Sequence, residues 1–282
     1  MGRTFVVLAC AMLAVPVAAQ RPAPDSIPAA GGAITVQPLT HATLQITQGS
    51  HIVLIDPTIF TGYDGLPQPV PISYGGLKPP TLILVTDEHS DHFDAAAIGK
   101  MRTPATKVVT FARPPSFGLP VQGAIRLANG QMQTVDGVAI EAVPMYNLQR
   151  GFQGELFHTK GRGNGYVVTL GGKRLYVAGD TECTPEMKAL RNIDVAFLPM
   201  NLPYTMTPAE AADCAKAFKP KIVYPYHYRG QDPKAFAAAL KGSGIEVRLR
   251  DWYPGAPPFT YDPKQPFGAA APPPPPPPPP PG

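Results

Sequence analysis

The sequence predicts an α/β domain in which two β-sheets pack face to face and helices cover their outer faces. Hairpin turns and β-branched segments dominate the first half of the chain, whereas helix starts alternate with apolar strands in the second half. With 282 residues, of which 44% are hydrophobic, the chain can bury one large core. We therefore expect a single domain and place it at residues 33–262.

The first half of this domain is expected to open with a β-hairpin. Residues 41–46 and 51–57 are rich in β-branched side chains and are joined across Gln48-Gly49-Ser50. An apolar strand is expected over residues 81–85, followed by a short helix over residues 93–100. Further strands are expected at residues 108–111 and 125–127, and a second hairpin over residues 133–143 turns at Asp136-Gly137.

The second half is expected to begin with another hairpin and then to alternate helices with strands. The hairpin joins residues 166–170 to residues 173–178 through Gly171-Gly172. Thr207 and Glu210 form a capping box around Pro208, which is a strong helix-start signal. The expected helix starts are Thr184-Pro185, Thr207-Pro208 and Asp232-Pro233, and the expected strands are residues 195–198, 221–226 and 245–249.

A long segment between these early strands is rich in Gly and Pro. It covers residues 61–80, and structureless loops of this length in compact domains are often functional. Tyr63 and Tyr74 lie within it. The loop is therefore either a cover for a bound substrate or a decoration of the surface.

The start of the chain, residues 1–19, has the pattern of a cleaved signal peptide. Arg3 precedes an apolar run from Phe5 to Val15, and Val17-Ala18-Ala19 fits a small-x-small cleavage site. The apolar run is shorter than the roughly 20 residues that cross a bilayer as a helix. We therefore expect a periplasmic or secreted protein without stable membrane insertion after cleavage, and a lipid anchor at Cys10 is the alternative.

Two segments beside the domain are expected to lack regular structure. Residues 20–32 are rich in Pro, Ala and Gly, which is typical of a flexible segment. Residues 263–282 form a proline-rich tail, and its unbroken run from Pro272 to Pro281 favours an extended polyproline II rod. The tail is a spacer or a ligand for a proline-recognising partner, and the absence of flanking basic residues favours the spacer.

The charge and the cysteine content limit the expected classes of binding partner and the expected cellular compartment. The net charge of +4 is dispersed along the chain, without the basic stripe that nucleic-acid binders carry, so we expect a small-molecule substrate and no nucleic acid. The sequence does not predict an oligomeric state. Once the leader is removed, Cys183 and Cys214 remain, and they either pair in an oxidising compartment or stay as buried free thiols.

The most informative stretch follows the expected strand at residues 81–85. It reads Thr86-Asp87-Glu88-His89-Ser90-Asp91-His92 and holds five side chains that can bind a metal ion. Carboxylates gathered in one short loop repel one another unless a cation neutralises them. Two more candidate ligands end apolar strands, namely Asp180 after residues 175–179 and His227 after residues 222–226. The pattern therefore predicts a metal site at strand ends.

These motifs, in this order, resemble the metallo-β-lactamase fold superfamily over residues 38–251. The superfamily has a first motif H-x-H-x-D-H, then a histidine, then a bridging aspartate in a G-D context, and a final histidine. His41-Ala42-Thr43 together with Ile55-Asp56-Pro57 is similar to the branch of ascorbate-6-phosphate lactonases and N-acyl-phosphatidylethanolamine phospholipase D. The resemblance implies a four-layer αββα sandwich and two divalent metal ions.

By position, the resemblance also implies a ligand set. Asp87 and His89 would hold the first ion, Asp91, His92 and His227 would hold the second, and Asp180 would bridge both. Asp87 stands where the superfamily usually has a histidine, and this harder oxygen ligand favours manganese or iron over zinc. Asp91 and Asp180 are also the expected catalytic residues.

The middle histidine of the pattern has no direct counterpart after residues 141–145, where Tyr146-Asn147 stands instead. His158 lies in a glycine-rich loop and is the expected ligand, with Asn147 as the alternative. We expect His51 to be structural. Residues expected to support the ligands or the substrate are His41, Asp56, Tyr146, Asn147, Tyr226 and Arg229.

Such a site predicts hydrolysis of an ester, lactone, amide or phosphodiester, because two adjacent cations activate water and hold the electrophilic group beside it. Two alternatives stay open. An iron-dependent redox enzyme of the same superfamily is one, because Asp87 replaces a histidine. The other is a non-catalytic envelope protein that binds metal or displays polyproline.

Overall fold

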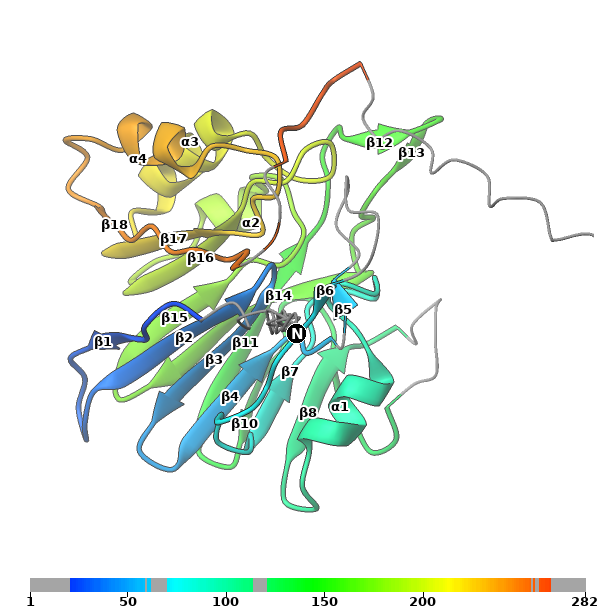
Figure 1. Ribbon diagram of the computed structural model, residues 1–282, viewed down its shortest axis with the longest axis vertical. Coiled ribbons are helices and arrows are strands. Elements are labelled where there is room, and N and C mark those ends of the chain that lie inside the picture. Colours follow the sequence, from blue (N-terminus) through cyan, green and yellow to red (C-terminus); the bar gives the residue numbers. More distant parts are fainter. Residues whose placement is uncertain are drawn as a thin grey trace, which may run out of the picture.

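The computed structural model describes residues 21–58, 60–61, 70–113, 121–254, 256 and 259–264. Two large β-sheets pack face to face, and helices cover the two outer faces (Figure 1). In this view α1 lies beside β8 at the lower right, and α3 and α4 lie at the upper left. The four-layer αββα arrangement expected from the sequence is therefore confirmed.

The first sheet has seven strands in the order β1-β2-β3-β4-β7-β8-β9. Its strands are β1 (Asp25–Ile27), β2 (Ile34–Thr40), β3 (Thr43–Gln48), β4 (His51–Ile55), β7 (Leu82–Leu84), β8 (Lys107–Phe111) and β9 (Ile125–Leu127). The first four pair antiparallel, and β4, β7, β8 and β9 pair parallel. Because parallel strands end at the same edge, β4 and β7 deliver the residues that follow them to one side.

The second sheet also has seven strands, in the order β10-β11-β14-β15-β16-β17-β18. Its strands are β10 (Met132–Val135), β11 (Val138–Met145), β14 (Gly163–Leu170), β15 (Lys173–Val177), β16 (Val195–Pro199), β17 (Ile222–Tyr226) and β18 (Glu246–Val247). The first four pair antiparallel, and β15 to β18 pair parallel. The predicted turns at Asp136-Gly137 and Gly171-Gly172 are confirmed, and all four turn residues have positive φ angles.

Two short hairpins stand apart from the main sheets. One pairs β5 (Phe60–Thr61) with β6 (Val70–Pro71), and the other pairs β12 (Gly151–Phe152) with β13 (Glu155–Leu156). The β12–β13 hairpin extends away from the body of the molecule at the upper right of Figure 1. It lies just before His158 in the chain, so it belongs to the loop that carries that residue.

Each helix begins with a residue that caps its free N–H groups. The helices are α1 (Ala95–Met101), α2 (Pro185–Lys188), α3 (Pro208–Phe218) and α4 (Pro233–Ala239). The side chains of Asp94, Thr184, Thr207 and Asp232 accept from backbone N–H groups at these starts. The capping box predicted at Thr207 and Glu210 is present.

The main core lies between the two sheets. It joins buried side chains of the first sheet, such as Leu44 and Ile46, to those of the second, such as Tyr166 and Val168. A second cluster packs α2, α3 and α4 on the outer face of the second sheet, and a third packs Ile98 of α1 on the first. Burial of these apolar faces fixes the sheets against each other and thereby the edge where their strands end.

Several expected boundaries are corrected by the structure. Residues 25–27, within the segment expected to be flexible, form β1 because they pair with β2 at the sheet edge. The expected strand at residues 41–46 is displaced to β3, and His41 instead lies in the turn between β2 and β3 with φ 49°. The first helix begins at Ala95 rather than Phe93, since Asp94 caps it, and only residues 246–247 of the expected last strand pair with β17.

Cys183 and Cys214 form a disulfide with a Cα–Cα distance of 5.7 Å, so the pairing that the sequence left open is present. The expected signal peptide at residues 1–19, the proline run of the tail and Tyr63 lie outside the described residues. Among the described residues, no helix is long and apolar enough to cross a membrane.

Candidate metal centre

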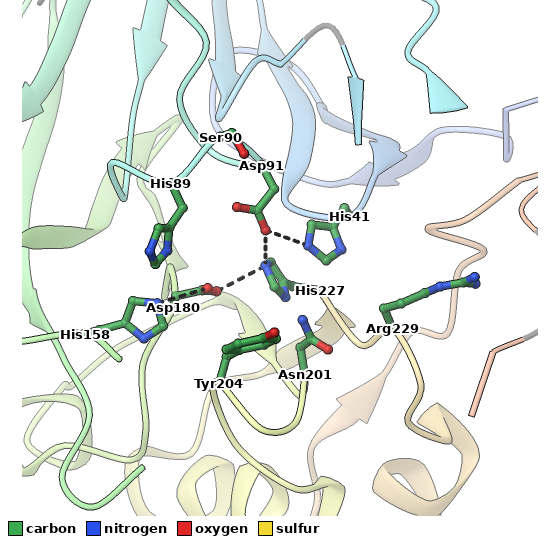
Figure 2. A pocket seen from close by; sticks show the side chains of 10 residues that line it. All are labelled: His41, His89, Ser90, Asp91, His158, Asp180, Asn201, Tyr204, His227 and Arg229. Carbon is green, nitrogen blue, oxygen red and sulfur yellow. Dashed lines mark hydrogen bonds and ion pairs between the residues drawn. The ribbon is translucent and has the colours of Figure 1, made fainter. Parts of the chain in front are cut away.

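The candidate ligands gather where strands of both sheets end (Figure 2). The loop Asp87–His92 follows β7, Asp180 follows β15 and His227 follows β17. The tight turn before Asp180 depends on Gly179, which has φ +67° and lies where a Cβ would stand 2.5 Å from the sulfur of Met145. The fold therefore brings residues from distant parts of the sequence to one buried point.

A first cluster contains Asp87, His89, His158 and Asp180. Nε2 of His158 lies 3.4 Å from Oδ2 of Asp180 and 3.8 Å from Oδ2 of Asp87. Nδ1 of His89 lies 2.8 Å from the same Asp87 oxygen. Asp87 and His158 are fully buried, and the cluster contains His158 rather than the alternative Asn147.

A second cluster contains His92, Asp180 and His227, and a third group of His41, Asp91 and His227 adjoins it. Nε2 of His227 lies 3.2 Å from Oδ1 of Asp180 and 3.1 Å from Nε2 of His92. Oδ2 of Asp91 lies 3.4 Å from Nε2 of His227 and 3.0 Å from Nε2 of His41. Asp180 therefore belongs to both main clusters, which is the geometry expected of a bridging carboxylate.

Buried oxygen atoms orient two of the histidines. Nδ1 of His92 lies 2.9 Å from Oδ2 of Asp56, and Asp56 in turn accepts from the N–H and the hydroxyl of Thr86. Nδ1 of His158 lies 2.5 Å from Oδ1 of Asn147. Because an N–H at Nδ1 leaves a lone pair on Nε2, both rings present Nε2 to the clusters as a potential metal ligand.

Three residues of the site adopt backbone conformations that are unfavourable for non-glycine residues. The φ angles are 49° for His41, 45° for Asp56 and 47° for His227. The N–H of His227 donates to the carbonyl of His41 at 3.1 Å, so two of these residues hold each other. Such strain persists only where the surrounding structure enforces it, and it is concentrated at functional sites.

The clusters combine buried carboxylates with buried imidazoles. Burial opposes ionisation of Asp87, but the hydrogen bond from His89 and the charge of nearby histidines outweigh it and hold the Asp87 pKa well below its ordinary value. Burial also disfavours a charged His92, yet neighbouring carboxylates, first of all Asp180 and Asp91, raise its pKa well above the ordinary value. This region of the protein therefore attracts positive charge.

At two other histidines of the site, burial outweighs the neighbouring carboxylates. Burial lowers the pKa of His158 to about 4, despite the opposing charges of Asp180 and Asp87. Burial and the positive charge of His227 lower the pKa of His41 to about 3. Both rings are therefore neutral at pH 7, and neutral imidazole is the form that binds metal.

The donor set fits divalent metal ions. Within the part of the chain that the structure describes, Nε2 of His158 and Oδ1 of Asp180 are buried and have no hydrogen-bond partner. Unpartnered buried polar atoms are costly, and both of these atoms lie in the clusters of candidate ligands. Imidazole and carboxylate groups at these positions are the ligands that zinc, manganese and iron take in proteins.

One cation of the protein itself lies beside the first cluster. Nε and Nη2 of Arg162 each lie 3.0 Å from an oxygen of Asp87, and Nη2 also lies 2.7 Å from Nε2 of His89. Arg162 is not among the site residues predicted from the sequence. Its only local signal was its place between two glycines in the loop that carries His158.

A pocket of about 240 Å³ opens over the clusters. Figure 2 shows Asn201, Tyr204 and Arg229 around it on the side away from the loop of His89. The guanidinium of Arg229 stacks on the rings of Tyr253 and Phe259, with centroid distances of 5.6 and 5.3 Å. Residues that line the pocket are His41, His89, Ser90, Asp91, His158, Asp180, Asn201, Tyr204, His227 and Arg229.

Two residues expected near the substrate do not reach this pocket. The hydroxyl of Tyr146 donates to Glu186 at 3.0 Å, away from the ligands. Tyr226 is fully buried, and its hydroxyl accepts from the N–H of Gly179 at 2.9 Å, where it supports the turn that presents Asp180. Asn147 contacts His158 rather than the clusters, and His51 lies on β4 outside them.

Fold and site together define a metallo-β-lactamase type of protein. Residues 35–227 match the family described as the beta-lactamase superfamily domain. The chain is 34% identical over 227 residues to a UPF0173 metal-dependent hydrolase of Symbiobacterium thermophilum, covering 73% of this chain and 91% of the relative. The chain therefore belongs to the β-lactamase superfamily, in its group of metal-dependent hydrolases.

Solved structures agree with this assignment. A candidate metal-dependent hydrolase of Parabacteroides distasonis is 37% identical and superposes with a TM-score of 0.70, covering 81% of this chain and 98% of that one. A metallo hydrolase of Ignicoccus hospitalis shares the fold at 22% identity, with a TM-score of 0.59 over 79% of this chain and 96% of that one. The narrower likeness to ascorbate-6-phosphate lactonases and N-acyl-phosphatidylethanolamine phospholipase D stays a prediction.

Proposed function

We propose that this protein is an exported hydrolase that uses two divalent metal ions and acts on an ester, lactone, amide or phosphodiester. The observation that carries the proposal is the shared position of Asp180, which belongs to both clusters of buried ligands beneath the pocket. Two cations held at these clusters would supply an activated water for hydrolysis of a small molecule.

The residues that would hold the ions follow from the two clusters. Asp87, His89, His158 and Asp180 surround the first position, and Asp91, His92, Asp180 and His227 surround the second. When bound, such ions lower the pKa of water and polarise the bond that is cleaved. Oxygen atoms supply half of the first set, which favours manganese or iron there more than an all-histidine set would.

Asp91 is placed to move the proton that hydrolysis releases. Its side chain is 25% exposed and lines the pocket, so water and substrate can reach it. His41 donates from Nε2 to Asp91, because an ionised carboxylate only accepts, and Nδ1 of this neutral ring then accepts from the hydroxyl of Tyr253 at 2.8 Å. This chain of hydrogen bonds orients Asp91.

Asp91 can carry the proton through both steps of the hydrolysis. The oxygen of water forms a bond to the carbonyl carbon or phosphorus, and its proton passes to the carboxylate of Asp91. The bond to the leaving oxygen or nitrogen then breaks, and Asp91 returns the proton to that atom. Asn201, Tyr204 and Arg229 line the pocket where the rest of the substrate would lie, and the charge of Arg229 favours a substrate with an anionic group.

Metal analysis combined with a substrate panel tests the enzymatic part of the proposal. Purified protein is loaded with zinc or manganese, and bound metal is counted by mass spectrometry before assays on lactone, phosphodiester, ester and amide panels. We expect metal-dependent turnover on at least one panel, and Asp91→Asn should lower kcat by about 100-fold or more with little effect on folding. Turnover that survives complete metal removal would refute the mechanism.

The proposal of export rests on the sequence of residues 1–19 and on the presence of a disulfide. The disulfide between Cys183 and Cys214 supports an oxidising environment, where such bonds persist. Amino-terminal sequencing of protein from the native host or a bacterial periplasm tests it. We expect the mature chain to begin near Gln20, and a chain that retains Met1 or carries a lipid on Cys10 would contradict cleavage after Ala19.

A further inference from the structure

The first cluster already contains a positive charge that belongs to the protein. Arg162 contacts both oxygens of the buried Asp87 carboxylate at 3.0 Å and also donates from Nη1 to the carbonyl of Phe157 at 2.9 Å. Its side chain is only 10% exposed, so little solvent weakens the ion pair. The guanidinium is therefore held firmly at the place where a cation would neutralise Asp87.

The contact between Arg162 and His89 determines which ring nitrogen of His89 carries the proton. Nη2 of Arg162 can only donate, so Nε2 of His89, 2.7 Å away, accepts and carries no proton. The proton of the neutral ring then lies on Nδ1, which donates to Oδ2 of Asp87 at 2.8 Å. Arg162, His89 and Asp87 thus satisfy one another without any metal ion.

Metal binding by His89 conflicts with this arrangement. Nδ1 faces Asp87, so a metal ion shared with Asp87 requires the lone pair on Nδ1 and moves the proton to Nε2. The Nε2–H group would then point at the N–H of Arg162, two donors 2.7 Å apart. Filling the first position therefore requires Arg162 to withdraw from His89.

In the described part of the chain, the second cluster has no counterpart of Arg162. His92, Asp180 and His227 bring ring nitrogens and a carboxylate oxygen within 3.1–3.4 Å of one another, and Oδ1 of Asp180 has no hydrogen-bond partner among the described residues. Nδ1 of His92 is already fixed on Asp56, which leaves Nε2 for a metal ion. These ligands are arranged for an ion, and in the ranges that the structure describes no ion pair joins Asp180 to a lysine or arginine.

We propose that Arg162 competes with a metal ion for the first cluster, so that the protein binds one ion tightly at His92, Asp180 and His227 and a second ion far more weakly at Asp87 and His89. This inference rests on the proposed function for the identity of the ligands, and it assigns the two positions unequal affinities. At low metal supply Arg162 replaces the second ion as the positive charge beside the pocket.

Metal titration of the Arg162→Gln variant tests the inference. Metal-free protein is titrated with zinc and, separately, with manganese, and both dissociation constants are measured by calorimetry with bound metal counted by mass spectrometry. The wild type should show one tight and one weak ion. In Arg162→Gln, the weaker ion, at the first cluster, should bind about 10- to 100-fold more tightly, the size of effect that groups around metal ligands produce. The tight ion at the second cluster should be unchanged.

Arg113→Gln is the matched control. Arg113 pairs with Glu88, the neighbour of Asp87 in the chain, at 2.9 Å, but its side chain is 48% exposed. Loss of its charge should leave both dissociation constants unchanged, which separates the contact at Asp87 and His89 from a general change in local charge. A tighter second ion in this control would overturn the competition model.

A second variant, Arg162→Lys, tests the inference independently in case Arg162→Gln does not fold. Arg162→Lys keeps the charge but cannot form the two parallel hydrogen bonds to Asp87, so the second ion should bind more tightly by a smaller factor. Weaker or unchanged binding of the second ion in either folded variant would overturn the inference. Two ions of equal affinity in the wild type would overturn it while sparing the proposed function, whereas no bound ion at all would overturn both.

Discussion

Nδ1 of His158 lies 2.5 Å from Oδ1 of Asn147, and this contact fixes the orientation of the His158 ring. The amide of Asn147 cannot turn around, because its Nδ2 donates to the carbonyl of Tyr204 at 2.8 Å. The backbone N–H of Asn147 donates to the carbonyl of His158 at 2.8 Å, and the backbone N–H of His158 donates to Oδ1 of Asn147 at 2.9 Å, which adds to this restraint. A histidine from a glycine-rich loop thus gains the orientation that a strand would otherwise provide.

Asn147→Ala should therefore weaken metal binding at the first cluster by about 10- to 100-fold, as removal of such partners does in metal sites. His158 would lose the acceptor for its Nδ1–H, although Nε2 itself would be unchanged. Competition with a chromogenic chelator measures the change. Asn147→Asp is the matched control, because it keeps an acceptor oxygen and should retain most of the affinity; an equal loss in both variants would contradict a positioning role.

Asp180→Ala should lose metal from both positions, whereas Asp87→His should retain two ions. Asp180 contributes to both clusters, so its loss removes a ligand from each, and turnover should fall by more than about 100-fold. The histidine in Asp87→His is a competent ligand that prefers zinc and cannot form the ion pair with Arg162. Metal content after equal exposure to zinc and manganese, with hydrolysis on the responding panel, distinguishes the variants. Wild-type metal content in Asp180→Ala would contradict the bridging role.

Local signals explain which parts of the fold could be predicted from the sequence. The turn at Asp136-Gly137 requires positive φ angles that these residues tolerate, and the helix start at Thr207 needs only side chains within one turn. The order of the metal motifs was equally local, because Asp180 and His227 directly follow apolar strands. Each of these features depends on residues that are neighbours in the chain.

Features that depend on tertiary contacts could not be predicted in this way. Strand β1 exists because residues 25–27 pair with β2, although their composition favours a loop. Arg162 reaches Asp87 across 75 positions in the sequence, and no pattern around either residue indicates that contact. Tyr226 adjoins His227 in the chain yet packs in the core between the sheets, in the same cluster as Tyr224.

Replacing Cys183 and Cys214 together by serine should lower the free energy of unfolding by about 3 kcal/mol, since the disulfide closes a loop of 31 residues in the unfolded chain. Urea unfolding with and without reductant measures this. The wild type should lose a similar amount when reduced, and the double variant should not respond to reductant, which serves as the control. Equal stability of wild type and variant under oxidising conditions would show that the bond does not stabilise the fold.

Glu210→Gln should destabilise the protein near pH 7 but not at low pH. Burial opposes ionisation of Glu210, but the N–H of Thr207 and the guanidinium of Arg150 outweigh it and lower its pKa below the ordinary 4.5. A carboxyl group whose pKa is lowered by folding stabilises the folded state above the unfolded pKa, and this contribution is lost as pH falls through the folded pKa. The side chain is 39% exposed, so we expect roughly 0.5 kcal/mol at pH 7.

Thermal unfolding of wild type and Glu210→Gln at pH 7 and at pH 3 measures this difference. The gap in Tm should be present at pH 7 and should shrink at pH 3, where the carboxyl group approaches its neutral form in both states. Glu155→Gln, at an exposed position of β13, is the control for loss of one negative charge and should leave Tm unchanged at pH 7. Because Arg150 also contacts Glu182, two residues after Asp180, a gap that persists unchanged at pH 3 would mean that Glu210 supports this region by packing rather than by charge.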